Sequence, residues 1–336
     1  MTLKRISLTD LDRWLDRLRE RGAVYAPGKD KAGETVLLGP SGREPAVLEY
    51  RNFSRSPKAF LLPQNQTLLC FNDGKAEEPP LPDEEVLLFG VRPCDARAIL
   101  ALDRVFLEGD PPDPYYTQAR ARTTVVALAC SRPMASCFCT SVGGGPGDAA
   151  GADVRAVALG DDLLLESQGP RGEALLAFAA DLLAEATPAM VDEAQKQVRA
   201  VEGQVAPVNA EKSAERLRKA YDSPLWQAVA QKCLGCGTCS FLCPTCHCFD
   251  ITDEMRNGTG RRVRTWDCCA YPLFTLHGSG HNPRPTAKER WRQRMMHKFR
   301  YAVENYEQLF CVGCGRCIRH CPVGMDLRTV LKEVGA

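Results

Sequence analysis

Cysteines carry the most distinctive chemistry in this chain, and eight of them fall in two copies of one motif. Residues 233–244 read CLGCGTCSFLCP and residues 311–322 read CVGCGRCIRHCP. Both copies are C-x2-C-x2-C-x3-C-P, and seven of their twelve positions are identical. This is the ligand spacing of bacterial ferredoxins, in which thiolates from one tight loop bind the irons of a [4Fe–4S] cube. The repeat therefore predicts two [4Fe–4S] clusters and one-electron chemistry.

The fourth cysteine of each motif is expected to point away from its own cube, because in two-cluster ferredoxins it binds the other one. The predicted ligands are, for cluster A, Cys233, Cys236, Cys239 and Cys321, and, for cluster B, Cys311, Cys314, Cys317 and Cys243. This exchange would tie together segments that start 78 residues apart, so cluster loss is expected to unfold the domain. Structural zinc is the competing interpretation, but zinc ribbons use pairs of C-x2-C without the x3-C-P tail.

Seventeen cysteines in 336 residues is a high count. The number is odd and the N-terminus lacks the apolar core of a secretion signal, so a disulfide framework is not expected. No apolar run approaches the length of a transmembrane helix, and a formal net charge of +1 gives no general reason to bind nucleic acid. The expected setting is the cytoplasm, with no membrane insertion and no nucleic-acid partner.

Four of the remaining cysteines lie where predicted strands end. Val86–Val91 is a continuous apolar run typical of a buried strand, and Ala96–Phe106 follows as a helix that Asp95 is placed to cap. A second buried strand is predicted over Thr123–Ala129. Strand ends at one edge of a sheet are common positions for functional groups. A third cluster is therefore a candidate, with the ligands Cys94, Cys130, Cys137 and Cys139. The alternative is that each thiol is a small buried hydrophobe.

A 66-residue insertion, 245–310, separates the two motifs and carries further thiols. One interpretation is a metal site formed by Cys246, Cys248 and Cys269, with Cys268 or His281 as fourth ligand. Adjacent cysteines rarely bind one cube together, so the preferred interpretation is that these thiols pack around clusters A and B and exclude water. Residues 284–300 carry seven Lys and Arg against one Glu. Such a run usually forms a solvated helix face, but beside anionic clusters it would also raise their potentials or dock an acidic partner.

The predicted fold is a mixture of α/β and α+β structure in two domains. Residues 1–205 are expected to form an α/β domain, and residues 206–336 a ferredoxin-like domain with two clusters and the long insertion, reached through a helical connector. Locally, we expect a helix over 7–21 that starts with a Ser7 cap, a strand over Lys58–Leu62 and a core position for Cys70. The pattern Gly145-x-Gly147-x-x-Ala150 matches a dinucleotide fingerprint only superficially, because it follows a cysteine-rich loop rather than a strand.

Further motifs resemble one known family. FGVRPCD at 89–95, the C-x6-C-x-C pattern at 130–139, CPTCHCFDI at 243–251, RTWDCC at 264–269 and SGHNPRPT at 279–286 are similar to the iron–sulfur β subunit of cytosolic sulfhydrogenases. These belong to the NAD(P)-linked [NiFe] hydrogenase / sulfur reductase group, and the A subunit of anaerobic sulfite reductase is similar too. The resemblance covers nearly the whole chain. Cys268 departs from the family pattern, which has serine there, so Cys269 is the family-like residue.

The resemblance implies an electron-transfer subunit of a multi-subunit oxidoreductase. Such a subunit carries electrons between a flavin-containing subunit that reacts with NAD(P)H and a catalytic subunit of the nickel hydrogenase or siroheme type. The sequence agrees, since cluster motifs are present and no convincing flavin, nucleotide or nicotinamide site is found. Two alternatives stay open. One is an enzyme that reduces a sulfur compound at a third, N-terminal cluster, and the other is a cysteine-rich structural or zinc-binding scaffold.

Overall fold

The structure, a computed structural model, describes residues 2–39 and 45–334. Its strands, in chain order, are β1 (Leu3–Ser7), β2 (Gly22–Lys29), β3 (Thr35–Leu38), β4 (Asn65–Asn72), β5 (Lys75–Glu77), β6 (Glu85–Val91), β7 (Thr123–Leu128), β8 (Val154–Leu159), β9 (Asp162–Ser167), β10 (Ala184–Glu185), β11 (Phe249–Arg256) and β12 (Thr259–Trp266). Its α-helices are α1 (Leu11–Leu18), α2 (Pro93–Phe106), α3 (Pro114–Ala121), α4 (Pro170–Phe178), α5 (Pro188–Glu202), α6 (Ser213–Lys219), α7 (Leu225–Ala230), α8 (Thr238–Phe241), α9 (Ala287–Met296), α10 (Ala302–Tyr306), α11 (Arg316–Arg319) and α12 (Leu327–Glu333). Short 3₁₀ turns cover Pro57–Phe60, Cys139–Val142 and Ala180–Leu182, and a π-helical turn covers His297–Tyr301.

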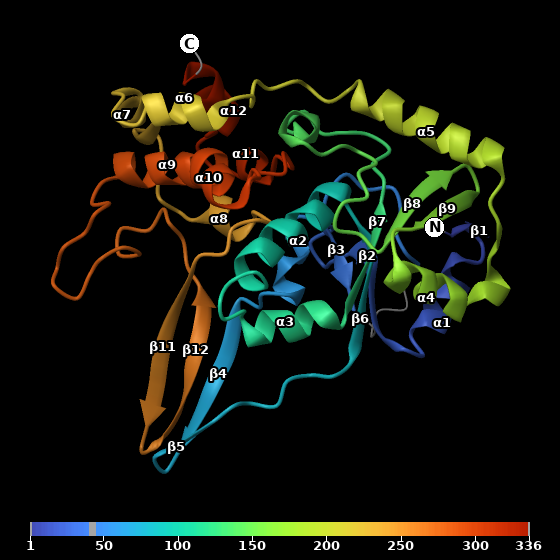
Figure 1. The fold of residues 1–336 in the computed structure, drawn as a ribbon, viewed down its shortest axis with the longest axis horizontal. Coiled ribbons are helices and arrows are strands. Elements are labelled where there is room, and N and C mark those ends of the chain that lie inside the picture. The colour runs from blue at the N-terminus through green and yellow to red at the C-terminus, as the bar shows by residue number, and fades with distance from the viewer. Residues whose placement is uncertain (1, 40–44, 335–336) are drawn as a thin grey trace.

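These elements form two sheets with helices packed around them (Figure 1). The larger sheet has eight strands in the order β10-β1-β9-β8-β7-β6-β2-β3, and the neighbours β2, β6, β7 and β8 run parallel. The smaller sheet is antiparallel, in the order β11-β12-β4-β5, and projects away from the body of the molecule. The larger sheet confirms that the fold is mixed α/β.

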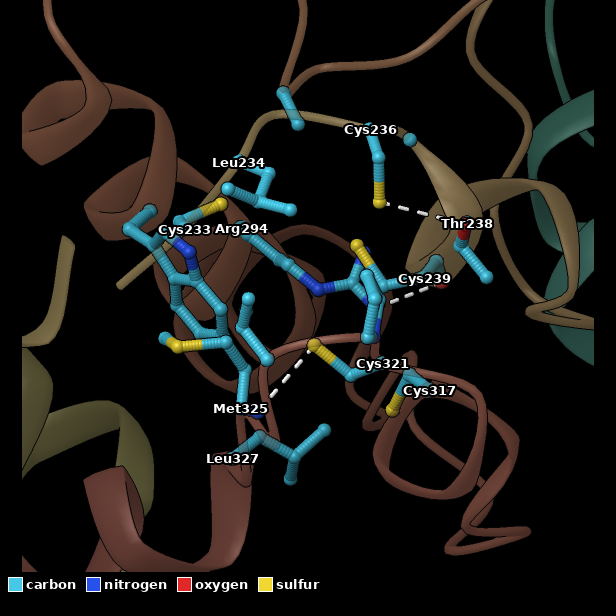
Figure 2. Close-up of a pocket in the computed structure, with 15 residues that line it drawn as sticks. Cys233, Leu234, Cys236, Thr238, Cys239, Arg294, Cys317, Cys321, Met325 and Leu327 are labelled. Atoms are coloured by element: carbon cyan, nitrogen blue, oxygen red, sulfur yellow. Dashed lines mark hydrogen bonds between the residues drawn. The ribbon is translucent and has the colours of Figure 1, made fainter. Parts of the chain in front are cut away.

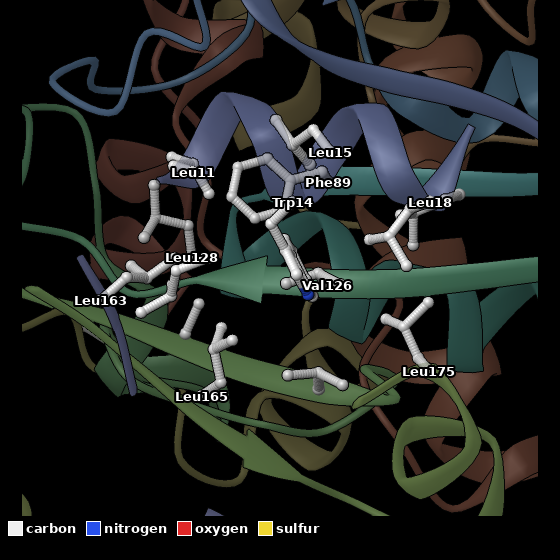
Figure 3. Packing of buried hydrophobic residues seen from close by; sticks show 14 of the residues in the cluster. Leu11, Trp14, Leu15, Leu18, Phe89, Val126, Leu128, Leu163, Leu165 and Leu175 are labelled. Atoms are coloured by element: carbon white, nitrogen blue, oxygen red, sulfur yellow. The ribbon is translucent and has the colours of Figure 1, made fainter. Parts of the chain in front are cut away.

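Helices α1 and α4 cover one face of the larger sheet. In α1 the apolar residues Leu11, Trp14, Leu15 and Leu18 recur at helical spacing, so they share one face, and all four are buried. They pack on side chains of the central strands, among them Phe89, Val126, Leu128, Leu163 and Leu165 (Figure 3). This apolar layer holds the central strands in place.

The opposite face is covered by α2 and α3, which pack on the alternate residues of the same strands. Because β6 and β7 are buried on both faces, they are nearly continuous apolar runs, as predicted. Strand β6 leads directly into α2, and Cys94 lies in the first turn of that helix. Cys130 lies two residues after the end of β7. Since β6 and β7 are parallel neighbours, both thiols lie at the same edge of the sheet.

The smaller sheet joins distant parts of the chain. Strands β4 and β5 precede residue 205, whereas β11 and β12 belong to the insertion 245–310, and β12 pairs with β4 from Thr259 opposite Asn72 to Thr265 opposite Asn65. The predicted domain boundary near residue 205 stays a prediction, but strands from both sides of it share one sheet. The hairpin of β11 and β12 turns at Asn257 and Gly258, which have φ of 51° and 80°. Asn-Gly is a strong hairpin signal, so this turn could have been predicted from the sequence.

Three local predictions were wrong. The helix expected over 7–21 with a Ser7 cap spans only Leu11–Leu18, because Ser7 ends β1 instead and Asp10 takes the N-cap position. The strand expected over Lys58–Leu62 is a 3₁₀ turn that begins at Pro57, and Ser56 Oγ caps it by accepting a hydrogen bond from the Lys58 amide. Cys70 is exposed rather than in the core, because β4 lies in the projecting sheet.

The two cysteine motifs lie in a helical layer at the C-terminal end of the chain. Helices α6, α7, α9 and α12 enclose an apolar core whose most buried members are Leu217, Trp226, Met295, Met296 and Phe299. Figure 1 shows this layer above the projecting sheet and beside α2. Within residues 2–39 and 45–334 no helix has both the length and the apolar character to cross a membrane.

Candidate metal centres

The first motif forms one wall of a cavity. Cys233, Cys236 and Cys239 line it together with Cys321 from the second motif, and Figure 2 shows their thiols arranged around a common space. The glycines of the motif have left-handed backbone angles, with φ of +67° at position 235 and +78° at position 237. Glycine adopts this conformation at little cost, so the loop can curl and present three thiols to one side. The four residues are those predicted for cluster A.

The second motif forms a second cavity in the same way. Cys311, Cys314 and Cys317 line it together with Cys243 from the first motif. Three of these thiols are buried, whereas Cys236 of the first cavity is exposed. The structure therefore brings together both predicted sets of four, with the fourth residue exchanged between motifs, and it leaves the first cavity nearer to solvent.

Hydrogen-bond donors already surround several of these sulfurs. The Gly235 amide donates to Cys233 Sγ at 3.4 Å, and the Met325 amide donates to Cys321 Sγ at 3.3 Å. The Cys236 thiol donates to the Thr238 hydroxyl at 3.4 Å, and the same hydroxyl can donate to the sulfur once that is a thiolate. Bonds of this kind to cluster sulfurs are one of the means by which proteins set cluster potentials.

A buried lysine contacts the second cavity. Lys298 is 4% exposed, and its ammonium donates to Cys243 Sγ at 3.3 Å, to Thr245 Oγ1 at 2.9 Å and to the Phe310 carbonyl at 3.0 Å. It lies in the π-helical turn 297–301, a feature that is frequent at functional sites. Burial acts to lower the pKa of Lys298, but the thiolates of Cys243 and Cys246 outweigh burial and raise it. The ammonium therefore stays charged.

A buried arginine lies one helical turn earlier and lines both cavities. Arg294 is 4% exposed and donates to the Cys239 carbonyl at 2.9 Å and to Ser240 Oγ at 3.2 Å. Its guanidinium also lies 3.7 Å from Cys246 Sγ. Figure 2 shows this side chain extending among the thiols of the first cavity. Arg294 thus places one fixed positive charge between the two sites.

A third buried cation comes from the N-terminal half of the chain. Lys58 is 4% exposed, donates to the carbonyls of Ser240 at 3.2 Å and Cys246 at 2.8 Å, and lies 4.1 Å from the centre of the Trp266 ring. Two half-buried histidines lie in the same region. Burial lowers the pKa of both His247 and His297 to about 4, so their rings are neutral at pH 7. The positive charge around the motifs therefore comes from lysine and arginine.

These cations fit anionic iron–sulfur clusters. The hydrogen-bond acceptors of Lys58, Arg294 and Lys298 are carbonyls, hydroxyls and thiols, and within residues 2–39 and 45–334 no carboxylate pairs with them. A buried charge is costly unless it is paired. A four-thiolate cube would supply the missing negative charge. In the same part of the chain no three Cys, His, Asp or Glu side chains gather closely enough for a single metal ion, whereas a cube spreads its ligands over different irons.

The four N-terminal thiols converge beside the second cavity. Cys130 lies near Cys94, Cys137 and Cys139, and Cys94 packs against the small apolar group that contains Cys314 of the second motif. Burial raises the pKa of Cys94 and Cys130 above the ordinary range and that of Cys139 to about 12. The predicted third set is therefore brought together at one sheet edge, next to the ligands predicted for cluster B.

The loop that carries these thiols touches the second motif through its backbone. The Phe138 amide donates to the Gly313 carbonyl at 2.9 Å. A Cβ at Gly313 would lie 2.5 Å from the Cys139 amide nitrogen and 2.6 Å from its Cα. Such distances leave no space for a side chain, so Gly313 allows the two loops to approach each other.

Gly313→Ala is therefore expected to destabilise the protein much more than Gly324→Ala. Both glycines have left-handed φ, +64° and +67°, but a Cβ at Gly324 meets nothing within 4 Å. The backbone penalty of about 1–2 kcal/mol should be common to both variants. The steric clash at Gly313 should add roughly 1–3 kcal/mol more. Thermal denaturation of the anaerobically reconstituted variants would measure this difference, and equal losses would show that the loops do not need this approach.

A buried ion pair also joins the two halves of the chain. Arg316 of the second motif forms two hydrogen bonds of 2.7 Å with the carboxylate of Asp95, and both side chains are fully buried. Arg316 also donates to the Phe53 carbonyl at 2.9 Å. Asp95 was expected to cap α2, but the N-cap is Arg92, and Asp95 lies within the first turn. The pair was not predicted, because 221 positions separate its members and no local pattern links them.

The thiols of the insertion form a group of their own. Cys269 hydrogen-bonds to both Cys248 and Cys268, and Cys246 hydrogen-bonds to Cys243 of the second cavity. Cys268 and Cys269 are buried. His281 is exposed and contacts another histidine of its loop, so the structure does not bring it to these thiols. A metal site at Cys246, Cys248 and Cys269 stays a prediction.

Comparisons with known proteins agree with the two cavities. A family model described as a 4Fe-4S dicluster domain matches residues 232–325, which contain both motifs and the insertion. The chain is also 33% identical over 332 residues to sulfhydrogenase 2 subunit beta of Pyrococcus furiosus, and the alignment covers 96% of this chain and 95% of that protein. The match to the dicluster family confirms the prediction of two [4Fe–4S] clusters.

Proposed function

The chain belongs to the family of sulfhydrogenase β subunits, and from this premise we propose that it is the electron-transfer subunit of a cytoplasmic oxidoreductase complex. Its neighbours in the complex would be a flavin-containing subunit that reacts with NAD(P)H and a catalytic subunit of the [NiFe] hydrogenase or sulfur reductase type. Within that complex the chain would carry single electrons between the two.

The observation that carries this proposal is the pair of adjoining cavities. Each is lined by its four predicted ligands, and Arg294 and Cys317 line both, so two clusters held there would be close neighbours. When bound, each [4Fe–4S] cluster supplies a one-electron couple. The protein holds the thiolates in position, excludes water with the apolar residues around α9 and compensates charge with buried cations. A protein that transfers electrons without reacting with a substrate needs these three features.

We also propose a third cluster at Cys94, Cys130, Cys137 and Cys139. Besides the grouping of the thiols, a fourth buried cation without a carboxylate partner supports this proposal. Arg92 is 1% exposed, its hydrogen bonds go to backbone carbonyls, and its guanidinium carbon lies 3.7 Å from the centre of the Tyr50 ring. No carboxylate pairs with it in the described ranges, so an anionic cluster beside Cys130 would balance its charge. This site would extend the relay from cluster B into the α/β domain.

The isolated chain, reconstituted with iron and sulfide, is expected not to oxidise NADH or NADPH. Its bleaching by dithionite should show that the clusters are present and reducible. Addition of the flavin-containing subunit should then allow NAD(P)H to reduce the same clusters. Anaerobic absorbance spectroscopy measures each step. Turnover of NAD(P)H by the chain alone and free of flavin would overturn the proposal, and a siroheme-containing subunit in the native complex would assign it to a sulfite reductase instead.

A further inference from the structure

Three exposed leucines belong to the first motif and to the loop whose start packs on it. Leu234 lies inside the first motif and is 68% exposed, next to the exposed Cys236. Leu273 and Leu276 are 72% and 46% exposed, in the loop that follows β12. The start of this loop packs on the motif, since Ala270 and Pro272 line the same hollow as Leu234. Figure 1 shows the rest of the loop projecting from the molecule between β12 and α9. Large apolar side chains exposed together in this way mark interaction sites.

Basic residues predominate around this apolar surface, and Glu289, which lies between Lys288 and Arg290, is engaged in capping α9 with Thr286. From Cys268 to Lys288 the sequence contains no Asp or Glu. Arg290 donates to the backbone carbonyls of Arg284 and Pro285 rather than to a carboxylate. Lys232, immediately before the first motif, is exposed as well. An apolar centre with a basic rim is therefore present at the edge of the site predicted for cluster A.

We propose that this surface, formed by Leu234, Leu273, Leu276, Lys232, Arg284, Lys288 and Arg290, docks an acidic redox subunit and is the place where electrons enter or leave the chain. The inference rests on the proposed function, because it requires a cluster in the first cavity. That cavity has the exposed ligand Cys236, whereas three of the four thiols of the second cavity are buried and none is exposed. A partner seated here would bring its own redox group closest to cluster A.

The positive charge of this surface indicates which kind of partner binds there. Complementary charges steer association and fix orientation, so carboxylates are expected around the redox group of the partner. A second copy of this chain is disfavoured, because a two-fold interface would place the same basic surface against itself. The exposed leucines favour a protein partner, because protein interfaces bury an apolar centre within a polar rim.

Zero-length carbodiimide cross-linking of the native complex tests this proposal, since the reagent joins lysine amines to carboxylates in contact. We expect Lys232 and Lys288 to be joined to Asp or Glu residues of a subunit that carries a flavin or an iron–sulfur cluster. Cross-links from these two lysines to another copy of this chain would contradict the proposal. The absence of any cross-link from them, while other lysines of the chain react, would contradict it too. A complex that contains no other redox subunit would instead overturn the proposed function.

A matched pair of variants separates docking from cluster loss. The variant with Lys288→Glu and Arg290→Glu should bind the released redox subunit at least tenfold more weakly at low salt, and the difference should shrink as salt is added. Lys196→Glu, on α5 and away from the motifs, should bind as the unmodified chain does. Both variants should keep the iron content and the electron paramagnetic resonance spectrum of cluster A. Unchanged binding of the charge-reversed variant with intact clusters would contradict the inference.

Discussion

Replacing Cys314 with alanine is expected to remove cluster B, with a loss of about four irons per chain. Cys314 is buried in the second cavity, where it lies with Cys311, Cys317 and Cys243. Without cluster B the buried charge of Lys298 loses its counter-charge, so the surrounding structure should loosen too. Electron throughput in the assembled complex should fall to background.

Cys70→Ala is the matched control for this loss. Cys70 is an exposed thiol on β4, outside both cavities. This variant should keep the full iron and acid-labile sulfide content and full throughput. The measurement is an iron and sulfide count on anaerobically purified protein, followed by an activity assay of the complex. A Cys314→Ala chain that retained all its iron and its activity would show that the ligand assignment is wrong.

Removing the charge of Lys298 is expected to lower the reduction potential of cluster B on the order of 100 mV. A unit charge roughly 5 Å away contributes about 3 kcal/mol at an effective dielectric constant of about 20. For a one-electron couple this corresponds to about 140 mV, which relaxation and ions should reduce. The potential is expected to fall because reduction adds negative charge beside the Lys298 ammonium, which stabilises the reduced cluster. This ammonium contacts Cys243 Sγ at 3.3 Å. Lys298→Met, which keeps the length and loses the charge, is the variant to measure.

Two further variants separate charge from packing. Lys298→Arg keeps a positive charge and should leave the potential close to that of the unmodified chain. Lys288→Met removes a charge from the half-buried first turn of α9, outside both cavities, and should shift the potential much less, because distance and solvent screen it. A redox titration followed by electron paramagnetic resonance would report each value, with cluster B identified as the signal that Cys314→Ala removes. A Lys298→Met potential equal to that of the unmodified chain would exclude Lys298 as a tuning residue.

The sequence allowed the cysteine sets to be predicted because their spacing is local and the chemistry is specific. The three thiols of each motif lie within seven residues, and the exchange of Cys243 and Cys321 follows from the family of two-cluster ferredoxins. The strands β6 and β7 were predictable for a similar reason, since burial on both faces requires continuous apolar runs. Because Cys94 and Cys130 directly follow these two runs, their position at one sheet edge was predictable as well.

The rest depended on contacts between distant segments. Lys58 reaches the carbonyl of Cys246 across 188 positions, and Asp95 pairs with Arg316 across 221. No periodicity in the sequence indicates such contacts. The charged run at 284–300 was interpreted as a solvated face, with cluster tuning or docking as the other roles. In the structure it divides, because Arg294 and Lys298 turn inward to the thiols while Lys288 stays outside.

The central claim, a relay of [4Fe–4S] clusters held by this one chain, is tested most directly by metal and sulfide analysis of the full chain purified without oxygen. The account predicts equal amounts of iron and acid-labile sulfide, about twelve of each per chain, with about eight from the two motifs and about four from the N-terminal thiols. About eight irons and eight sulfides per chain would show that the third cluster is absent and that the relay consists of two clusters. Zinc bound without acid-labile sulfide would contradict the account as a whole.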